Sequence, residues 1–124
     1  MSKTTVKILQ DGENRSAEPY EVSIVDGSTI EFSAPVGGDT LLSLSPETAV
    51  LLDPKPDTLQ VKIAGGASVS YQFRKAANHS YCCQVLAAGS DVGPIQCPDA
   101  QGDALLTILS SGSRNLSSKT GRGL

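Results

Sequence analysis

The sequence predicts an all-β domain that folds as a two-sheet antiparallel sandwich, and three observations support this fold class. Hydrophobic and polar residues alternate over most of the chain, as they do in strands that bury one face. Turn residues separate the alternating runs at intervals of roughly 8–12 residues, which is typical of sandwiches and barrels. No window has the 3.6-residue hydrophobic repeat of a helix, and 12 glycines and 7 prolines interrupt the chain. A Greek-key order of the strands is expected for such a sandwich.

The first half of the chain contains one of two predicted hairpins. Residues 20–24 alternate, with Tyr20 directed to the core, and residues 29–33 alternate in the same way. Asp26-Gly27 lies between the two runs, and this pair favours the tight turn of a hairpin. A further strand is expected in this half at residues 4–9, and residues 41–44 and 49–52 are expected to add one or two short strands around Ser45-Pro46.

The second half contains the other predicted hairpin and the last strands. Residues 59–63 and 69–73 both alternate, and Gly65-Gly66 between them predicts the turn. Two more strands are expected, at residues 81–85 and 105–109. Residues 87–103, which connect these two strands, are rich in glycine, proline and alanine. A loop of this length in a compact domain is usually functional or poorly ordered.

The length of 124 residues fits one domain. We expect the sandwich to occupy residues 1–110, because the strand pattern ends there. Residues 111–124 are rich in serine and glycine, lightly basic and short of apolar side chains, so we expect a flexible C-terminal tail. The alternative for this tail is a peptide that docks on a partner.

Charge and hydropathy exclude two classes of partner. The net charge is -3 and the charges are scattered, so the chain lacks the basic patch that nucleic-acid binding requires. No apolar run approaches the roughly 20 residues of a membrane-spanning helix.

No signal peptide is visible at the N-terminus, which predicts a cytoplasmic protein. A periplasmic or secreted protein from which the leader has been removed would have the same sequence.

Histidine content restricts the chemistry that the chain can perform. His79 is the only histidine, so the two-histidine sites of zinc hydrolases and copper proteins are excluded. A serine-histidine-aspartate triad needs one histidine, but the chain has no G-x-S-x-G motif, and His79 follows Asn78 in an expected turn. No catalytic residue is therefore predicted, and we do not expect an enzyme.

The sequence also lacks a convincing metal or cofactor site. A zinc site made of His79, Cys82, Cys83 and Cys97 is disfavoured, because neighbouring residues on a strand point to opposite faces. The aspartates of residues 91–103 lack the spacing of a calcium-binding loop. The Gly37-Gly38 and Gly65-Gly66 pairs lack the lysine and the following helix of a phosphate-binding loop. No metal-binding or cofactor-binding residue is predicted.

Strand alternation places the cysteines in different environments. Cys83 shares a face with Tyr81 and Val85, so we expect a buried and inert thiol. Cys82 is expected to face outward, toward solvent or the loop that carries Cys97. Two interpretations stay open: three unpaired cysteines, as in a reducing cytosol, or a Cys82–Cys97 disulfide that fastens the loop. Cys83 replaces Cys82 in that disulfide if a bulge changes the alternation.

Two segments resemble the cupredoxins. They are VDGSTIEFSAP (residues 25–35) and GGASVSYQFRKAANHSYCCQV (residues 65–85). In that family a glycine-rich turn leads into an alternating Y-x-F strand, and an aromatic-rich strand then ends in the copper-binding cysteine. The resemblance implies a cupredoxin-like sandwich, with Cys83 at the copper-cysteine position.

Copper binding does not follow from this resemblance. The family holds copper with two histidines, a cysteine and usually a methionine, whereas this chain has one histidine, which precedes the cysteines, and Met1 as its one methionine. We therefore expect a cupredoxin-like sandwich without the metal. An immunoglobulin-like sandwich is the alternative fold, although the chain has no tryptophan for the hallmark buried position.

The combination of a regular core pattern with no cluster of reactive groups favours a binding function. We expect a non-enzymatic module that associates with another protein or with copies of itself. The first alternative is a thiol/disulfide redox switch that uses Cys82 and Cys97. The second is a carbohydrate- or small-ligand-binding sandwich, which is weakened by the small number of aromatic rings (2 Phe, 3 Tyr, no Trp).

Overall fold

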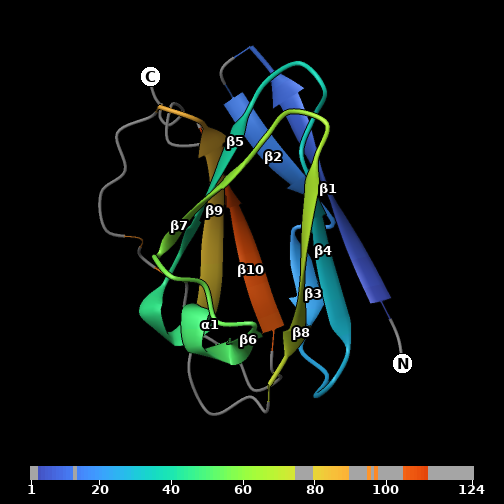
Figure 1. Cartoon of the computed structure of the whole chain (residues 1–124), viewed down its shortest axis with the longest axis vertical. Coiled ribbons are helices and arrows are strands. Elements are labelled where there is room, and N and C mark those ends of the chain that lie inside the picture. The colour runs from blue at the N-terminus through green and yellow to red at the C-terminus, as the bar shows by residue number, and fades with distance from the viewer. Residues whose placement is uncertain are drawn as a thin grey trace, which may run out of the picture.

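The computed structural model describes residues 3–12, 14–74, 80–89, 95, 97 and 105–111, and these residues form a β-sandwich of two five-stranded sheets (Figure 1). The predicted fold class is confirmed at this level. The first sheet contains, in spatial order, β2 (Asn14–Glu18), β1 (Lys3–Asp11), β4 (Thr29–Ser33), β8 (Ser68–Phe73) and β6 (Leu52–Asp53). The second sheet contains β3 (Glu21–Ser23), β10 (Leu105–Ser110), β9 (Tyr81–Ala87), β5 (Thr40–Leu44) and β7 (Gln60–Ile63).

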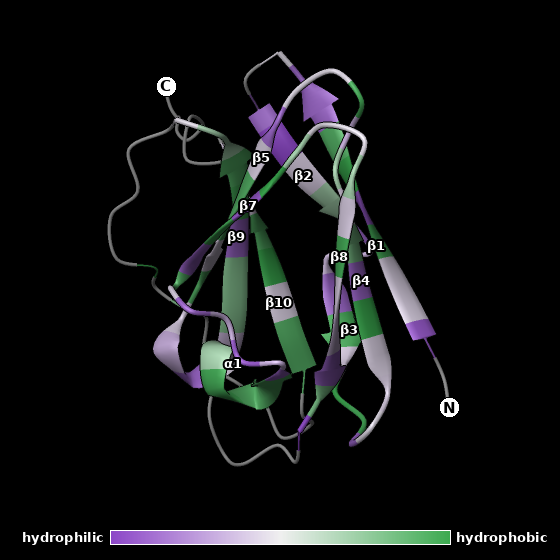
Figure 2. Ribbon diagram, viewed as in Figure 1, coloured by the Kyte–Doolittle hydropathy of each residue, from purple (hydrophilic) through white to green (hydrophobic). Residues whose placement is uncertain are grey.

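The hydrophobic core lies between the sheets and is made of the inward-facing residues of each strand. β4 illustrates the pattern, because Ile30 and Phe32 are fully buried while the residues beside them are half-exposed. β9 departs from alternation, since all of its residues are buried or half-buried. Figure 2 shows β9 and β10 as mostly hydrophobic strands in the middle of the second sheet. The centre of the second sheet is therefore covered on more than its inner face.

Both predicted hairpins are wrong, because each turn carries the chain from one sheet to the other. β3 belongs to the second sheet and β4 to the first, so the turn at Asp26-Gly27 joins different sheets. β7 and β8 are separated in the same way across Gly65-Gly66. In both cases the two strands point their apolar rows at one core from opposite sides. The alternating pattern is the same as in a hairpin, and so it does not distinguish the two connections.

Strand direction adds a feature that the sequence pattern did not predict. β1 runs parallel to β4, and β9 runs parallel to β10, so each sheet is mixed. The remaining strand pairs are antiparallel. Parallel neighbours require a long connection between them. The long segment after β9 provides such a connection, although most of its residues lie outside the described part of the chain.

The strand expected at residues 49–52 is wrong over most of its length, because a short helix, α1 (Pro46–Leu51), occupies this position. Ser45 caps the helix by accepting a hydrogen bond from the Thr48 backbone N–H, and Pro46 takes the first helical turn, where no N–H is needed. Six residues are too few to show a helical repeat. The Ser-Pro-Glu start was the available signal.

Two smaller differences concern the N-terminal region. β2 was not predicted, and it forms a hairpin with β1 around Gly12. Tyr20 was expected in the core, but it precedes β3 and is 62% exposed. Its backbone carbonyl instead accepts a hydrogen bond from Ile108, so the residue contributes to the sheet through its main chain.

Candidate functional site

The two ends of the sandwich differ in construction, and each contains residues that bear on function. We call one the stapled end: α1, the first residues of β9 and Cys97. We call the other the loop end: the β1–β2 turn at Asp11-Gly12, the β4–β5 loop (residues 34–39) and the β7–β8 turn (residues 64–67). Figure 1 shows the loop end at the top of the sandwich and α1 near the bottom.

At the stapled end, a disulfide joins Cys82 of β9 to Cys97. Cys97 comes from the long segment that follows β9, so the bond fastens this segment to the sandwich. Cys82 alternates with the inward residues Tyr81 and Cys83, as expected, yet it is 0% exposed. Of the two expected surroundings, solvent or the loop that carries Cys97, the structure has the second. Alternation indicates to which face a side chain points, but it does not indicate whether that face is covered.

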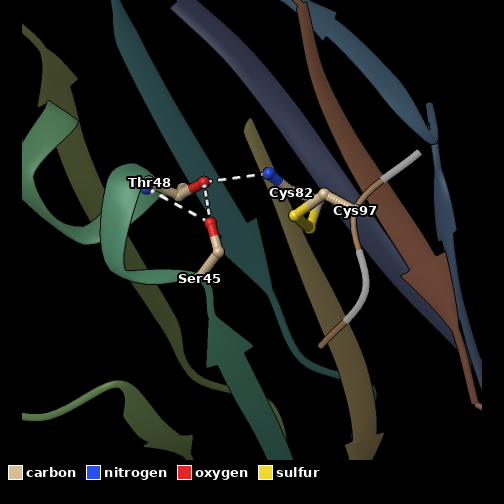
Figure 3. Close-up of a disulfide and its surroundings, with 4 residues drawn as sticks. All are labelled: Ser45, Thr48, Cys82 and Cys97. Carbon is tan, nitrogen blue, oxygen red and sulfur yellow. Dashed lines mark hydrogen bonds between the residues drawn. A yellow bond between two sulfur atoms is a disulfide. The ribbon is translucent and has the colours of Figure 1, made fainter. Parts of the chain in front are cut away.

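Hydrogen bonds connect the start of α1 to the same residue of β9 (Figure 3). The Cys82 backbone N–H donates to Thr48 Oγ1 at 2.9 Å, and the Cys82 carbonyl accepts from the Ser45 N–H at 3.2 Å. The hydroxyls of Ser45 and Thr48 are 2.8 Å apart and hydrogen-bonded. Cys82 pairs with Thr107 of β10 on one side, and these bonds satisfy its backbone groups on the other side, where the pairing with β5 ends at Leu44. Helix cap, strand and disulfide form one connected unit.

Cys83 is a free thiol and is fully buried in the core. Burial raises the pKa of this thiol far above its usual range, because the thiolate would be desolvated. It is the third residue of β9, near the start of the strand. In the cupredoxins, by contrast, the copper-binding cysteine lies at the end of its strand. The position and burial of Cys83 give it no access to an ion or an oxidant from solvent.

At the loop end, backbone hydrogen bonds join the β4–β5 loop to the β7–β8 turn. The Ala34 N–H donates to the Ala67 carbonyl at 2.9 Å, and the Gly66 N–H donates to the Pro35 carbonyl at 3.1 Å. The two segments approach so closely that a Cβ on Gly65 would lie 3.1 Å from the Val36 carbonyl oxygen. Two loops from different strand pairs therefore behave as one packed unit.

Asp39 adds a charged bond to this unit. Its carboxylate accepts from the Gly65 N–H at 2.9 Å and lies 3.5 Å from the Lys62 ammonium. The hydrogen bond from Gly65 is the main reason why the pKa of Asp39 is lowered from its ordinary value, and the Lys62 charge lowers it further. The ionised carboxylate is the form that holds the turn against the loop.

Arg15 connects the β1–β2 turn to the same loop from inside. This arginine of β2 points between the sheets and is 4% exposed. Its guanidinium donates to the Gly12 carbonyl at 3.1 Å, the Asp39 carbonyl at 3.3 Å and the Thr40 hydroxyl at 3.4 Å. The guanidinium also donates to the Asn14 carbonyl at 3.3 Å. All three turns of the loop end are thus tied together.

Val36 lies in the β4–β5 loop and is 88% exposed. It is more exposed than the other large hydrophobic residues in the described part of the chain, such as Val25 at 54% and Val50 at 55%. Exposed single apolar residues are common on protein surfaces. Val36 differs because the two residues before it, Ala34 and Pro35, are hydrogen-bonded to the β7–β8 turn.

Sequence reasoning missed Arg15, Val36 and Asp39, and each was missed for a physical reason. An arginine counts as polar in an alternating pattern, so its inward position was not recognised. Val36 stands alone between Pro35 and glycines, outside any strand pattern. Asp39 was one of many loop aspartates, and its partner Gly65 is distant in sequence.

Several predicted features lie outside the described residues. These are His79, the aspartates of residues 91–103 that were considered for calcium, and the tail after Ser111. Within the described residues, no group of three or more His, Cys, Asp or Glu side chains is arranged to hold a metal ion. No helix in this part of the chain is long and apolar enough to cross a membrane.

Comparisons with known proteins show no relative from which a function could be inferred. The chain matches no protein-family model, no curated protein and no solved structure.

Proposed function

We propose that this protein is a non-enzymatic binding module that recognises another protein through its loop end. The observation that carries the proposal is Val36, a large apolar side chain that is 88% exposed on a loop held at fixed geometry. A surface that is already ordered loses little conformational entropy on binding. An apolar side chain on such a surface gains hydrophobic energy when a partner covers it.

The sheet edges support recognition through loops rather than through strand pairing. β3 and β6 have three and two residues, which is too short to template a new strand. At the β2 edge, the backbone groups of Arg15 are already hydrogen-bonded to Ser111. The Arg15 carbonyl accepts from the Ser111 N–H at 2.9 Å, and the Arg15 N–H donates to the Ser111 hydroxyl at 2.6 Å.

At the remaining edge strand, β7, the Thr58 side chain occupies the outward backbone groups of Gln60. The Leu44 N–H donates to the Leu59 carbonyl, so the alternation of antiparallel bonds directs the backbone groups of Gln60 away from β5. The Thr58 hydroxyl donates to the Gln60 carbonyl at 2.6 Å and accepts from its N–H at 3.3 Å. An added strand would have to displace this hydroxyl. Self-assembly by edge pairing is therefore disfavoured.

Site-specific cross-linking tests the proposal. A photoreactive amino acid replaces Val36 in one variant, and Val25 or Val50 in two matched controls that are also exposed valines. We expect a discrete cross-linked species from position 36 only, and its mass distinguishes a second copy of the chain from a different protein. Equal cross-linking at all three positions, or none at position 36, would contradict the proposed site.

The thiol/disulfide switch is the second candidate function, because Cys82 and Cys97 are paired. Burial argues against attack at Cys82, which is fully buried, whereas Cys97 is half-buried, so exchange would have to begin at the Cys97 sulfur. A structural disulfide fits better, and it favours an oxidising compartment as the place of action. Alkylation of protein unfolded in urea without reductant, followed by intact mass, adds one label if the disulfide is present and three if all the thiols are free, because unfolding exposes the buried Cys82 and Cys83.

The cupredoxin-like assignment is part of the proposal at the level of fold type alone. It is supported by the turn and strand pattern of residues 25–35 and 65–85. It adds no argument for copper, because Cys83 is enclosed in the core and Cys82 is bonded to Cys97.

A further inference from the structure

The outermost strands of both sheets are short or already hydrogen-bonded at their edges, but β8, an inner strand, is open over part of its length. β4 pairs with β8 from Ser68 to Gln72 on one side. On the other side, β6 pairs with Gln72 and Phe73 alone. Ser68, Val69 and Ser70 therefore have a neighbouring strand on one side and none on the other. We call these three residues the open edge of β8.

The hydrogen bonds of the β4–β8 ladder fix the direction of the backbone groups in the open edge. The Phe73 N–H donates to the Ser28 carbonyl at 2.9 Å, and the bond at the opposite end of the ladder has the same phase. Because antiparallel bonds recur at every second residue, Val69 bonds to β4, whereas the N–H and carbonyl of Ser68 and Ser70 point away from it. Both serines are exposed, and their outward backbone groups have no backbone partner among the residues that the structure describes.

A groove of about 370 Å³ lies where β6 ends beside β8. It occupies the position that further residues of β6 would fill if this strand continued along β8. On the inner side of the sheet, Val69 is half-exposed and packs against the rim of the core. The open edge thus combines unpaired backbone groups, adjacent space and an apolar contact. The groove is lined by Thr29, Asp53, Pro54, Ser70, Tyr71 and Gln72.

We propose that the open edge of β8 binds an extended segment of another protein, which adds to the first sheet as a strand. Main-chain hydrogen bonds to Ser68 and Ser70 supply the affinity, as in other cases of strand addition. The residue opposite Val69 faces the core rim and is apolar, and the residues before and after it lie beside the two serines on the outer face and are polar. The inference goes beyond recognition at Val36, and each site can be tested without the other.

A second copy of the chain fits this edge poorly, because each copy carries β6 on the same side of β8. An antiparallel pair that matches Ser68 of one copy with Ser70 of the other would place β6 of one copy in line with the β7–β8 turn of the other. A parallel pair would bring the two β6 strands together. A single extended segment of another protein avoids both clashes.

The test is a titration of isotope-labelled protein with the peptide acetyl-Lys-Thr-Val-Thr-Val-Thr-Lys-amide, followed by backbone NMR. Main-chain bonds at two residues and one packed side chain predict a Kd on the order of 0.1–1 mM. We expect saturable shifts centred on the open edge and slower amide exchange at Ser68 and Ser70. Peptides that are N-methylated at one position each test the main chain directly. Affinity should fall by about tenfold at every second position and change little at the positions between them.

Two variants of Ser70 separate its main chain from its side chain. Ser70→Pro removes the outward N–H and leaves the bonds to β4 in place, so peptide affinity should fall by about tenfold. Ser70→Ala keeps the N–H and is the matched control, with affinity within about twofold of wild type. The β4 and β8 amide signals report whether the proline variant is folded. If it is not, the N-methylated series on wild-type protein decides.

An alternating response to N-methylation, together with shifts at the open edge, supports strand addition. No saturable shift, shifts centred elsewhere, or N-methylation effects without alternation would overturn the proposal. A folded Ser70→Pro variant with wild-type affinity would overturn it as well.

Discussion

At the stapled end, a covalent bond and a buried hydrogen-bond network connect β9 to α1 and to the segment that carries Cys97. At the loop end, backbone hydrogen bonds, one carboxylate and one buried arginine connect three turns. Both ends are fixed, but by different chemistry. At the stapled end Cys82, Cys83 and Thr48 are fully buried, and Cys97 is half-buried. The loop end presents Val36 to solvent.

Because the two ends are held by different chemistry, different solution conditions weaken each of them. A reductant acts on the stapled end through its disulfide, whereas acid acts on the loop end through Asp39. The loop end is also sensitive to packing at Gly65. A Cβ added there would crowd backbone atoms of the neighbouring loop, not a core side chain. On the proposed function, the stapled end stabilises the fold and the loop end maintains the binding surface. Perturbing each end separately tests this division.

The largest expected effect follows loss of the disulfide. Cys97→Ser opens a loop whose ends are 15 residues apart, and the loop-entropy relation predicts a loss of about 3 kcal/mol in the free energy of unfolding. Urea unfolding followed by circular dichroism measures it. Reduced wild-type protein is the control and should match the variant. A variant as stable as oxidised wild type would show that the disulfide does not support the fold.

Thr48 tests the hydrogen-bond network that accompanies the disulfide. Thr48→Val keeps the shape of the side chain but leaves the buried Cys82 N–H without its acceptor, which costs about 1–3 kcal/mol. Thr48→Ser keeps the hydroxyl and loses one methyl group, which costs about 0.8 kcal/mol. The serine variant should therefore be the more stable of the two in urea unfolding. The reverse order would mean that packing, and not the hydroxyl, connects α1 to β9.

The fold class could be predicted from sequence because alternation records which residues face a core. Ile30 and Phe32 were placed correctly for this reason. Alternation is identical in a hairpin and in a sheet-to-sheet connection, so the turns at Asp26-Gly27 and Gly65-Gly66 were assigned to the wrong connection. Distinguishing them requires the partner strands, which are distant in sequence.

The candidate site was less predictable than the fold. Strand parity directed Cys82 and Cys83 to opposite faces, and it allowed the pairing of Cys82 with Cys97 as one of two interpretations. It did not show that Cys82 is covered, because a covering segment is a tertiary feature. The inward position of Arg15 was hidden for a related reason. A buried arginine needs acceptors such as the Asp39 carbonyl, and these come from another part of the chain.

Gly65 and Gly12 distinguish close packing from backbone conformation at the loop end. Gly65→Asn places a Cβ against the backbone of Val36 and Gly38, at 3.1–3.2 Å, and the overpacking costs about 1–3 kcal/mol. Gly12 has a φ of +63° with no atom within 4 Å of the added Cβ. Asparagine tolerates this left-handed conformation, so Gly12→Asn should cost less than about 1 kcal/mol. Thermal unfolding of both variants makes the comparison. Equal losses would indicate that the two loops are not tightly packed.

Acid titration gives the smallest effect and isolates the contribution of the Asp39 carboxylate to the loop end. The pKa of Asp39 is lowered in the folded state from an ordinary value of 3.8, so its carboxylate stabilises the fold above that value. The contribution is lost as the pH falls through the lowered folded pKa. Glu31, whose pKa is lowered chiefly by its hydrogen bond from Lys3, adds a similar dependence in wild type and variant alike. Asp39→Asn retains an oxygen that can accept from Gly65 but has no charge to lose. Urea unfolding at a series of pH values should therefore show a shallower acid loss for this variant. Asp26→Asn, at the opposite end of the sandwich, is the control. Parallel curves for wild type and Asp39→Asn would show that the loop end is held by its backbone bonds and Arg15 without help from this carboxylate.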